Sequence, residues 1–118
     1  MGLRSSRPVD ARRQQLFGML ELHYRRCGWK VERAGDGTVR ANGPGGVTWI
    51  GMPILPDDLE EPEFERRLLE LSEQRMPHGQ LCPLELLPAE ECAAELEVRL
   101  RRLRLADRGH VAVYSVAA

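Results

Sequence analysis

The chain has 118 residues, a length typical of one domain with one hydrophobic core. Hydrophobic residues make up 42% of it and aromatic residues 5%, which excludes a disordered chain and predicts a core of Leu, Val, Ile and Ala. The net charge of −1 points to no class of partner, but residues 1–46 carry +5 and residues 47–118 carry −6. We therefore expect an electrostatically two-sided molecule unless the fold interleaves the two halves.

Three widely spaced cysteines, Cys27, Cys82 and Cys92, argue against a disulfide framework. No apolar run approaches the length of a membrane span. Lys30 is the only lysine among 17 basic residues, a bias typical of GC-rich coding sequence. These features predict a cytoplasmic protein of prokaryotic source with no membrane partner.

Residues 1–9 are predicted to form a flexible basic arm, and residues 10–118 a single α/β domain. Asp10 suits the N-cap of a first helix over about 10–27, which Gly28 would end. One apolar face of this helix is predicted from residues that recur at helical spacing, namely Leu16, Phe17, Leu20, Tyr24 and Cys27.

Three strands are predicted next, over residues 29–34, 38–42 and 47–55. Glycine-rich turns at 35–37 and 43–46 separate them, so we expect an antiparallel meander. The third strand is apolar on both faces, which favours a central, covered position.

The second half predicts a helix over about 62–75, an edge strand or extended loop over 80–87, a helix over about 88–105 and a final strand over 110–117. Pro83 favours the edge or loop interpretation because it lacks a backbone donor. The predicted fold class is α+β, in the order α-β-β-β-α-(β)-α-β, with the helices packed on the sheet. We expect the last strand to extend the meander and to join in parallel through a helical crossover.

The order helix, three strands, helix, strand over residues 10–87 resembles the core of the restriction-endonuclease-like nucleases. The resemblance implies an Asp on one strand and a Glu-x-Lys motif on the next, which together hold a divalent metal. The predicted third strand, residues 47–55, contains neither a carboxylate nor a lysine. The sequence therefore predicts at most a catalytically degenerate relative of these nucleases.

Other reactive residues have structural interpretations. The acidic run at 57–65 fits a solvated loop and a helix start, because it lacks the spacing of a calcium loop. The spacing of His78, Cys82 and Cys92 matches no zinc pattern, and Cys27 and Cys92 are predicted to be buried in helix faces. We expect no catalytic residue, no metal site and no cofactor.

Arginines crowd the end of the helix predicted over 88–105, where they complement the helix dipole. Glu95 with Arg99, and Glu97 with Arg101, have the spacing of stabilising pairs. The alternative is a nucleic-acid-binding surface that also uses the first helix. Its residues would be Arg12, Arg13, Arg25, Arg26, Arg99, Arg101, Arg102 and Arg104.

Two functional hypotheses remain. The first is a non-catalytic protein-interaction or oligomerisation module that self-associates as a homodimer through the apolar C-terminal strand, or binds another protein there. The second is a catalytically degenerate restriction-endonuclease-like domain, or another domain that binds nucleic acid through the arginines.

Overall fold

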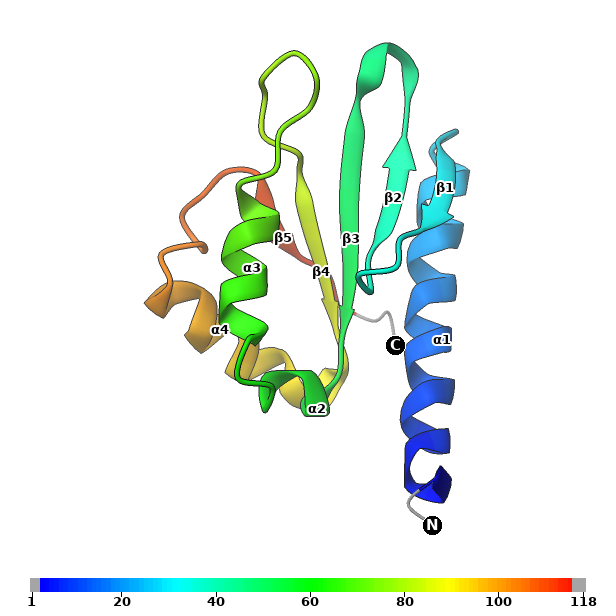
Figure 1. The fold of residues 1–118 in the computed structure, drawn as a ribbon, viewed down its shortest axis with the longest axis vertical. Coiled ribbons are helices and arrows are strands. Elements are labelled where there is room, and N and C mark those ends of the chain that lie inside the picture. The colour runs from blue at the N-terminus through cyan, green and yellow to red at the C-terminus, as the bar shows by residue number, and fades with distance from the viewer. Residues whose placement is uncertain (1–2, 116–118) are drawn as a thin grey trace.

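A computed structural model describes the backbone of residues 3–115 and the side chains of residues 10–115. The fold is α+β, with a mixed five-stranded sheet in the order β1-β2-β3-β4-β5 (Figure 1). The first three strands pair antiparallel, which confirms the predicted meander, and β3, β4 and β5 pair parallel. The last strand is parallel as predicted, but it pairs with β4, and β4 rather than β5 extends the meander. The strands are β1 (Lys30–Arg33), β2 (Val39–Asn42), β3 (Thr48–Ile54), β4 (Leu84–Pro88) and β5 (Val111–Val113).

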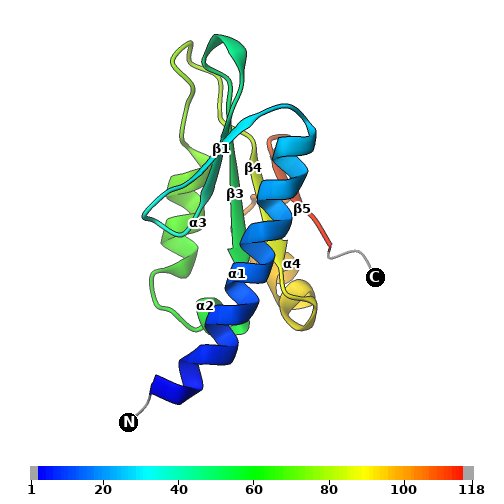
Figure 2. The same ribbon diagram turned by 90° about the vertical axis from the view of Figure 1, so that its right-hand side faces the viewer.

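Helices cover both faces of this sheet. Figure 2 shows α1 and α3 on opposite sides of it. The helix α4 packs beside α3, since Arg99 and Arg102 of α4 both contact Glu65 of α3. The helices are α1 (Leu3–Arg26), α2 (Pro56–Leu59), α3 (Phe64–Ser72) and α4 (Ala93–Arg102), with short 3₁₀ turns η1 (Pro44–Gly46) and η2 (Glu90–Cys92).

The helix α1 packs its predicted apolar face, including Leu20 and Tyr24, against β1, β2 and β3. It ends before Gly28, whose φ of 86° lies in the left-handed region that glycine adopts at low cost. The helix begins upstream of its predicted start, because the backbone is already helical at Leu3. Asp10 therefore lies inside α1 rather than at its N-cap.

The segment predicted as an edge strand or loop is instead the buried strand β4, hydrogen-bonded between β3 and β5. Pro83 does not interrupt the ladder because it lies just before the strand, where its carbonyl accepts from the Ile50 amide at 2.9 Å. Pro88 is the last residue of β4, so it does not open the next helix as predicted. The chain continues through η2, and α4 begins at Ala93.

The helix predicted over 62–75 is observed as α3, but the short helix α2 before it was not predicted. The Asp58 carboxylate accepts a hydrogen bond from the Leu55 amide at 2.8 Å, which caps α2. The same carboxylate accepts hydrogen bonds from both terminal nitrogens of Arg13 in α1, at 2.9 and 3.0 Å. This pair anchors α1 to the end of the sheet where β3 finishes.

The sequence halves of opposite charge are not interleaved, because the strands stand in the sheet in their chain order. Two ion pairs join the halves where they meet, Arg12 with Glu91 and Arg13 with Asp58. Part of the predicted charge separation is thus neutralised at this junction.

Candidate functional site

The strand β5 forms one edge of the sheet, the position that the self-association hypothesis requires. It is observed over Val111–Val113, shorter than the predicted 110–117, and residues 116 and 117 lie outside the described part of the chain. Its inner edge bonds to β4, where the His110 carbonyl accepts from Leu84 at 2.7 Å and the Tyr114 amide donates to Leu86 at 2.8 Å. Because backbone groups alternate along a strand, the Val113 amide and carbonyl point outward, away from β4.

A hollow of about 340 Å³ lies between this edge strand and α4. Val111 and Val113 form its apolar side, and Glu97 and Arg101 of α4 form its charged side. The predicted pair of Glu95 with Arg99 is observed at 3.0 Å, whereas Glu97 and Arg101 form no ion pair within the described residues. Two opposite charges therefore lie beside the open strand, and neither has an ion-pair partner among the side chains that the structure describes.

On the other face of the sheet, a larger cavity of about 550 Å³ opens between α1 and the end of β5. It exists because α1 packs over β1, β2 and β3 and leaves the neighbouring face of β4 and β5 less covered. Most of its wall is apolar, with two aromatic rings and the exposed Ser115 at its rim. The other lining residues are Met19, Leu20, His23, Leu87, Val113 and Tyr114.

Directly behind the Tyr114 wall of this cavity lies Glu85, a carboxylate of β4 that is only 4% exposed. The Tyr24 hydroxyl donates to its Oε1 at 2.6 Å, and the Tyr114 hydroxyl donates to its Oε2. No arginine, lysine or histidine pairs with Glu85 within the part of the chain whose side chains are described. The charge is therefore held by two phenol donors rather than by a cation.

Burial and the neighbouring Glu85 carboxylate raise the pKa of Tyr24 far above its usual range. The same two causes, again with burial first, raise the pKa of Tyr114. Both hydroxyls therefore keep their protons and remain donors to the carboxylate at any physiological pH. Gly51 makes this arrangement possible, because a Cβ there would lie 2.8 Å from the Tyr24 oxygen.

Glu85 was not predicted as a functional residue, because an edge strand or loop over residues 80–87 would leave its carboxylate in solvent. The available signal was a single acid inside the apolar run Leu84–Pro88, which in a buried strand requires hydrogen-bond partners. Tyr24 was assigned to the apolar face of the first helix, and it is buried there, but its hydroxyl also has this polar role.

The arginines predicted for nucleic-acid binding are divided between α1 and α4, which lie on opposite faces of the sheet. Arg12 and Arg13 pair with Glu91 and Asp58. Arg99 and Arg102 contact Glu65, and Arg99 also donates to the Leu59 carbonyl at 2.7 Å. The others are Arg25 and Arg26 in the last turn of α1, Arg101 in the hollow beside β5, and Arg104 just beyond α4. Nucleic-acid binding stays a prediction.

The cysteines differ from one another in exposure. Cys82 and Cys92 are buried, and burial raises the pKa of both thiols. The prediction that Cys27 is buried is wrong, because α1 ends at Arg26 and Cys27 turns outward in the following loop. Within the residues that the structure describes, no three His, Cys, Asp or Glu side chains gather closely enough to hold a metal ion.

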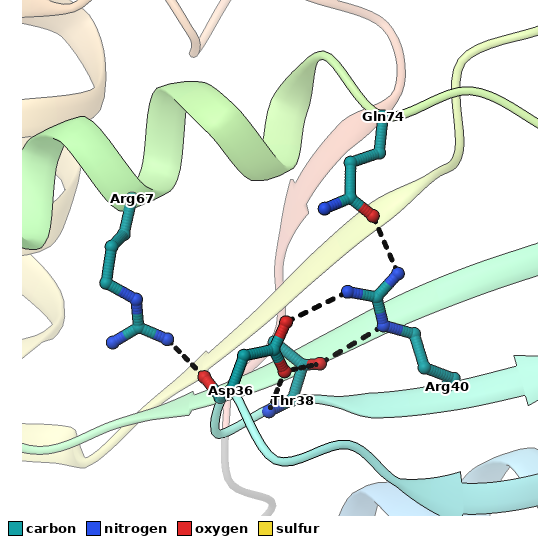
Figure 3. A network of polar contacts seen from close by, with 5 residues as sticks. All are labelled: Asp36, Thr38, Arg40, Arg67 and Gln74. Atoms are coloured by element: carbon teal, nitrogen blue, oxygen red, sulfur yellow. Dashed lines mark hydrogen bonds and ion pairs between the residues drawn. The ribbon is translucent and has the colours of Figure 1, made fainter.

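A second polar cluster joins the β1–β2 turn to α3 and the loop that follows it (Figure 3). Asp36 accepts from the Thr38 hydroxyl at 2.6 Å and from Arg40 at 3.0 Å. Arg40 also donates to Gln74 at 2.7 Å, and Arg67 donates to the Asp36 carbonyl. The Asp36 carboxylate is held by Thr38 and Arg40, so this cluster fixes the turn between β1 and β2.

Comparisons with protein families, with curated proteins and with solved structures found no match to this chain. In the described residues, no helix combines the length and the apolar character needed to cross a membrane. The geometry above is therefore the sole basis for a functional proposal.

Proposed function

We propose that this domain is an interaction module that pairs with a second copy of itself through the outer edge of β5. The observation that carries the proposal is an uncharged apolar edge strand with outward-pointing backbone groups, Val111–Val113. Such an edge is a template for further strand pairing unless charges, proline or a covering segment protect it. No charged residue occurs from Val111 to Ser115.

A second copy fits this edge better than a strand chosen at random. In an antiparallel pair centred on Ala112, Val111 of each copy would lie opposite Val113 of the other. Both cross-strand pairs would be apolar and of equal size, and no like charges would meet. The Val113 amide of each copy would donate to the Val111 carbonyl of the other, so the two-fold axis repeats the hydrogen bond.

The helix α4 supplies a second element of self-complementarity. A two-fold axis perpendicular to the sheet at β5 would bring the two α4 helices side by side on the same face. Glu97 of one copy would then approach Arg101 of the other, and the reverse contact would follow from symmetry. Both residues line the hollow beside β5 and lack an ion-pair partner within the described chain.

The experiment is sedimentation equilibrium over a wide concentration range, with two variants of Val113. Val113→Pro removes the outward amide and spares the ladder to β4, which uses the Tyr114 amide and the His110 carbonyl. Val113→Ala keeps that amide and reduces only the apolar contact. We expect a dimer that dissociates on dilution, a monomeric Val113→Pro variant and a weakened Val113→Ala dimer.

Leu22→Lys is the control for an altered surface, since Leu22 is 49% exposed on α1 and belongs neither to β5 nor to the hollow beside it. It should dimerise as the unaltered chain does. A chain that stays monomeric at every concentration contradicts the proposal. So does a Val113→Pro variant that is folded and still dimerises with unchanged affinity.

A further inference from the structure

The cavity between α1 and the end of β5 lies over a buried negative charge that has no cationic partner among residues 10–115, whose side chains are described. Glu85 is 4% exposed, and its two oxygens accept from the Tyr24 and Tyr114 hydroxyls. Phenol donors spread the charge of a carboxylate without cancelling it. The cavity beside Tyr114 therefore lies in a negative potential, and none of the described residues that line its wall is an arginine or a lysine.

Tyr114 lies between the Glu85 carboxylate and the cavity, and it determines which ligand groups can bind there. Its single hydroxyl proton is committed to Glu85, so the oxygen has only lone pairs left to offer another group. A ligand group that meets this oxygen must be a donor. Anions and carbonyl groups would find neither a donor on Tyr114 nor a favourable potential.

The rest of the wall suits an apolar chain with a positive end. The His23 and Tyr114 rings lie 5.5 Å apart between centroids in an edge-to-face arrangement, so one side of the cavity is aromatic. Met19, Leu20, Leu87 and Val113 supply apolar surface. The volume of about 550 Å³ is in the range of small-molecule sites, and aromatic faces attract cations.

We infer that this cavity binds a small alkylamine, whose primary ammonium group donates to the Tyr114 oxygen while its carbon chain packs on the apolar wall. The cavity lies on the face of the sheet opposite α4, and it shares Val113 with the strand edge of the proposed dimer. The two proposals are nevertheless tested separately, because the variants below change Glu85 and Tyr114 and keep Val113.

The test is a titration followed by two-dimensional NMR of the isotopically labelled full chain at constant ionic strength. The probe is n-butylammonium, and 1-butanol and butyrate are its neutral and anionic counterparts. We expect saturable shifts at the His23, Leu87 and Tyr114 amides. The charged hydrogen bond should make n-butylammonium bind about tenfold more tightly than 1-butanol, with butyrate weaker still.

Two variants test the Glu85 charge and the Tyr114 acceptor oxygen while they keep the shape of the cavity. Glu85→Gln removes the charge at nearly constant volume, and Tyr114→Phe removes the acceptor oxygen but keeps the ring. Each should weaken n-butylammonium binding about tenfold and leave 1-butanol nearly unaffected. Glu32→Gln is the matched control, because Glu32 is an exposed strand carboxylate on β1 and its loss changes the net charge equally.

The spectrum of each variant reports its own folding, and Tyr114→Phe alone decides the matter if Glu85→Gln does not fold. Equal affinity for n-butylammonium and 1-butanol would overturn the inference and leave an apolar cavity without charge selection. Shifts that never saturate, or that persist unchanged in Tyr114→Phe, would also overturn it.

Discussion

The Tyr24 hydroxyl of α1 lies 2.6 Å from Oε1 of Glu85 in β4, and it is one of two donors to that buried carboxylate. The contact joins a helix near the start of the chain to a strand 61 positions later. The second donor, Tyr114, follows β5. One carboxylate therefore connects α1, the central sheet and the C-terminal strand, and its loss should affect stability as well as any ligand.

Removing the Tyr24 hydroxyl should destabilise the fold more than removing that of Tyr114. Tyr24 is 1% exposed, so Tyr24→Phe leaves a buried carboxylate oxygen without its donor, at a cost of about 1–3 kcal/mol in the free energy of unfolding. Water can replace the half-buried Tyr114 hydroxyl. Urea unfolding of both variants measures the difference, and an equal or smaller loss in Tyr24→Phe would contradict this account.

Gly51 should be intolerant of even a methyl group. A Cβ there would lie 2.8 Å from the Tyr24 oxygen and 3.3 Å from Leu20 Cδ2, so Gly51→Ala should cost about 1–3 kcal/mol. The cost should shrink in a Tyr24→Phe background, where the nearest atom is gone. Gly18→Ala is the control, because nothing lies within 4 Å of its Cβ and alanine favours the helix by about 0.5–1 kcal/mol. Thermal unfolding of the four variants gives these values.

The parts of the fold that could be predicted are those with local signals. The meander follows from the glycine turns at 35–37 and 43–46, which separate three short segments of strand character, and its pairing is observed as expected. The position of β4 could not be predicted in this way. Pro83 indicates an edge only if it lies within the ladder, and the chain places it one residue before Leu84.

The candidate sites divide in the same way. The apolar character of the last strand can be read from the sequence, but its place at the edge follows only from the strand order of the sheet. The Glu85 site is non-local, because its donors come from α1 and from beyond β5. No spacing rule connects Tyr24, Glu85 and Tyr114, and only their packing across the sheet brings them together.

The turn at Asp36 should make stability depend on pH. Burial by itself would raise the pKa of the Asp36 carboxyl, but the Thr38 hydrogen bond and the Arg40 charge outweigh it and hold the pKa below its usual value. Because the folded-state pKa is the lower one, the stabilisation is present above about pH 4 and is lost as the pH falls through the folded-state pKa.

Asp36→Asn should therefore lower the free energy of unfolding at neutral pH, by an amount on the order of 1 kcal/mol at this partly exposed site. The gap between the variant and the unaltered chain should narrow as the pH falls below about 4. Urea unfolding at several pH values measures it. A difference in unfolding free energy that stays constant at all acid pH values would show that the Asp36 charge does not contribute to stability.

The three thiols should react in two classes. Cys27 is exposed and should react with a disulfide reagent at the rate of a free thiol. Cys82 and Cys92 are buried with raised pKa values, so they should react only as the fold opens. The number of protein thiols that react with the reagent, counted with and without denaturant, checks this. A Cys27→Ser variant should lose the one thiol that reacts fast in the native chain. More than one fast thiol in the native chain would contradict the burial of Cys82 and Cys92.

Charge exchange on α4 should test the geometry of the proposed dimer. Arg101→Glu would place two acids opposite each other at each end of the contact between the α4 helices. Glu97→Arg would place two bases opposite each other at the same positions. Each exposed ion pair contributes about 0.5 kcal/mol to the free energy of dimerisation. The two-fold axis repeats the pair, so a change from attraction to repulsion counts twice. Either single variant should therefore raise the dimer Kd by about an order of magnitude at low salt.

The double variant Glu97→Arg, Arg101→Glu restores opposite charges across the two-fold axis and should recover the original Kd. This recovery distinguishes the antiparallel arrangement from another dimer that uses the same surface. Only residues that face each other across the interface can exchange their charges without a loss of affinity. Arg66 and Glu70 provide the control, since they form an exposed pair within one chain at 3.4 Å on α3. Reversing both should leave the dimer unchanged. Sedimentation measures all the constants, and a double variant no better than the single ones would exclude the contact between Glu97 and Arg101.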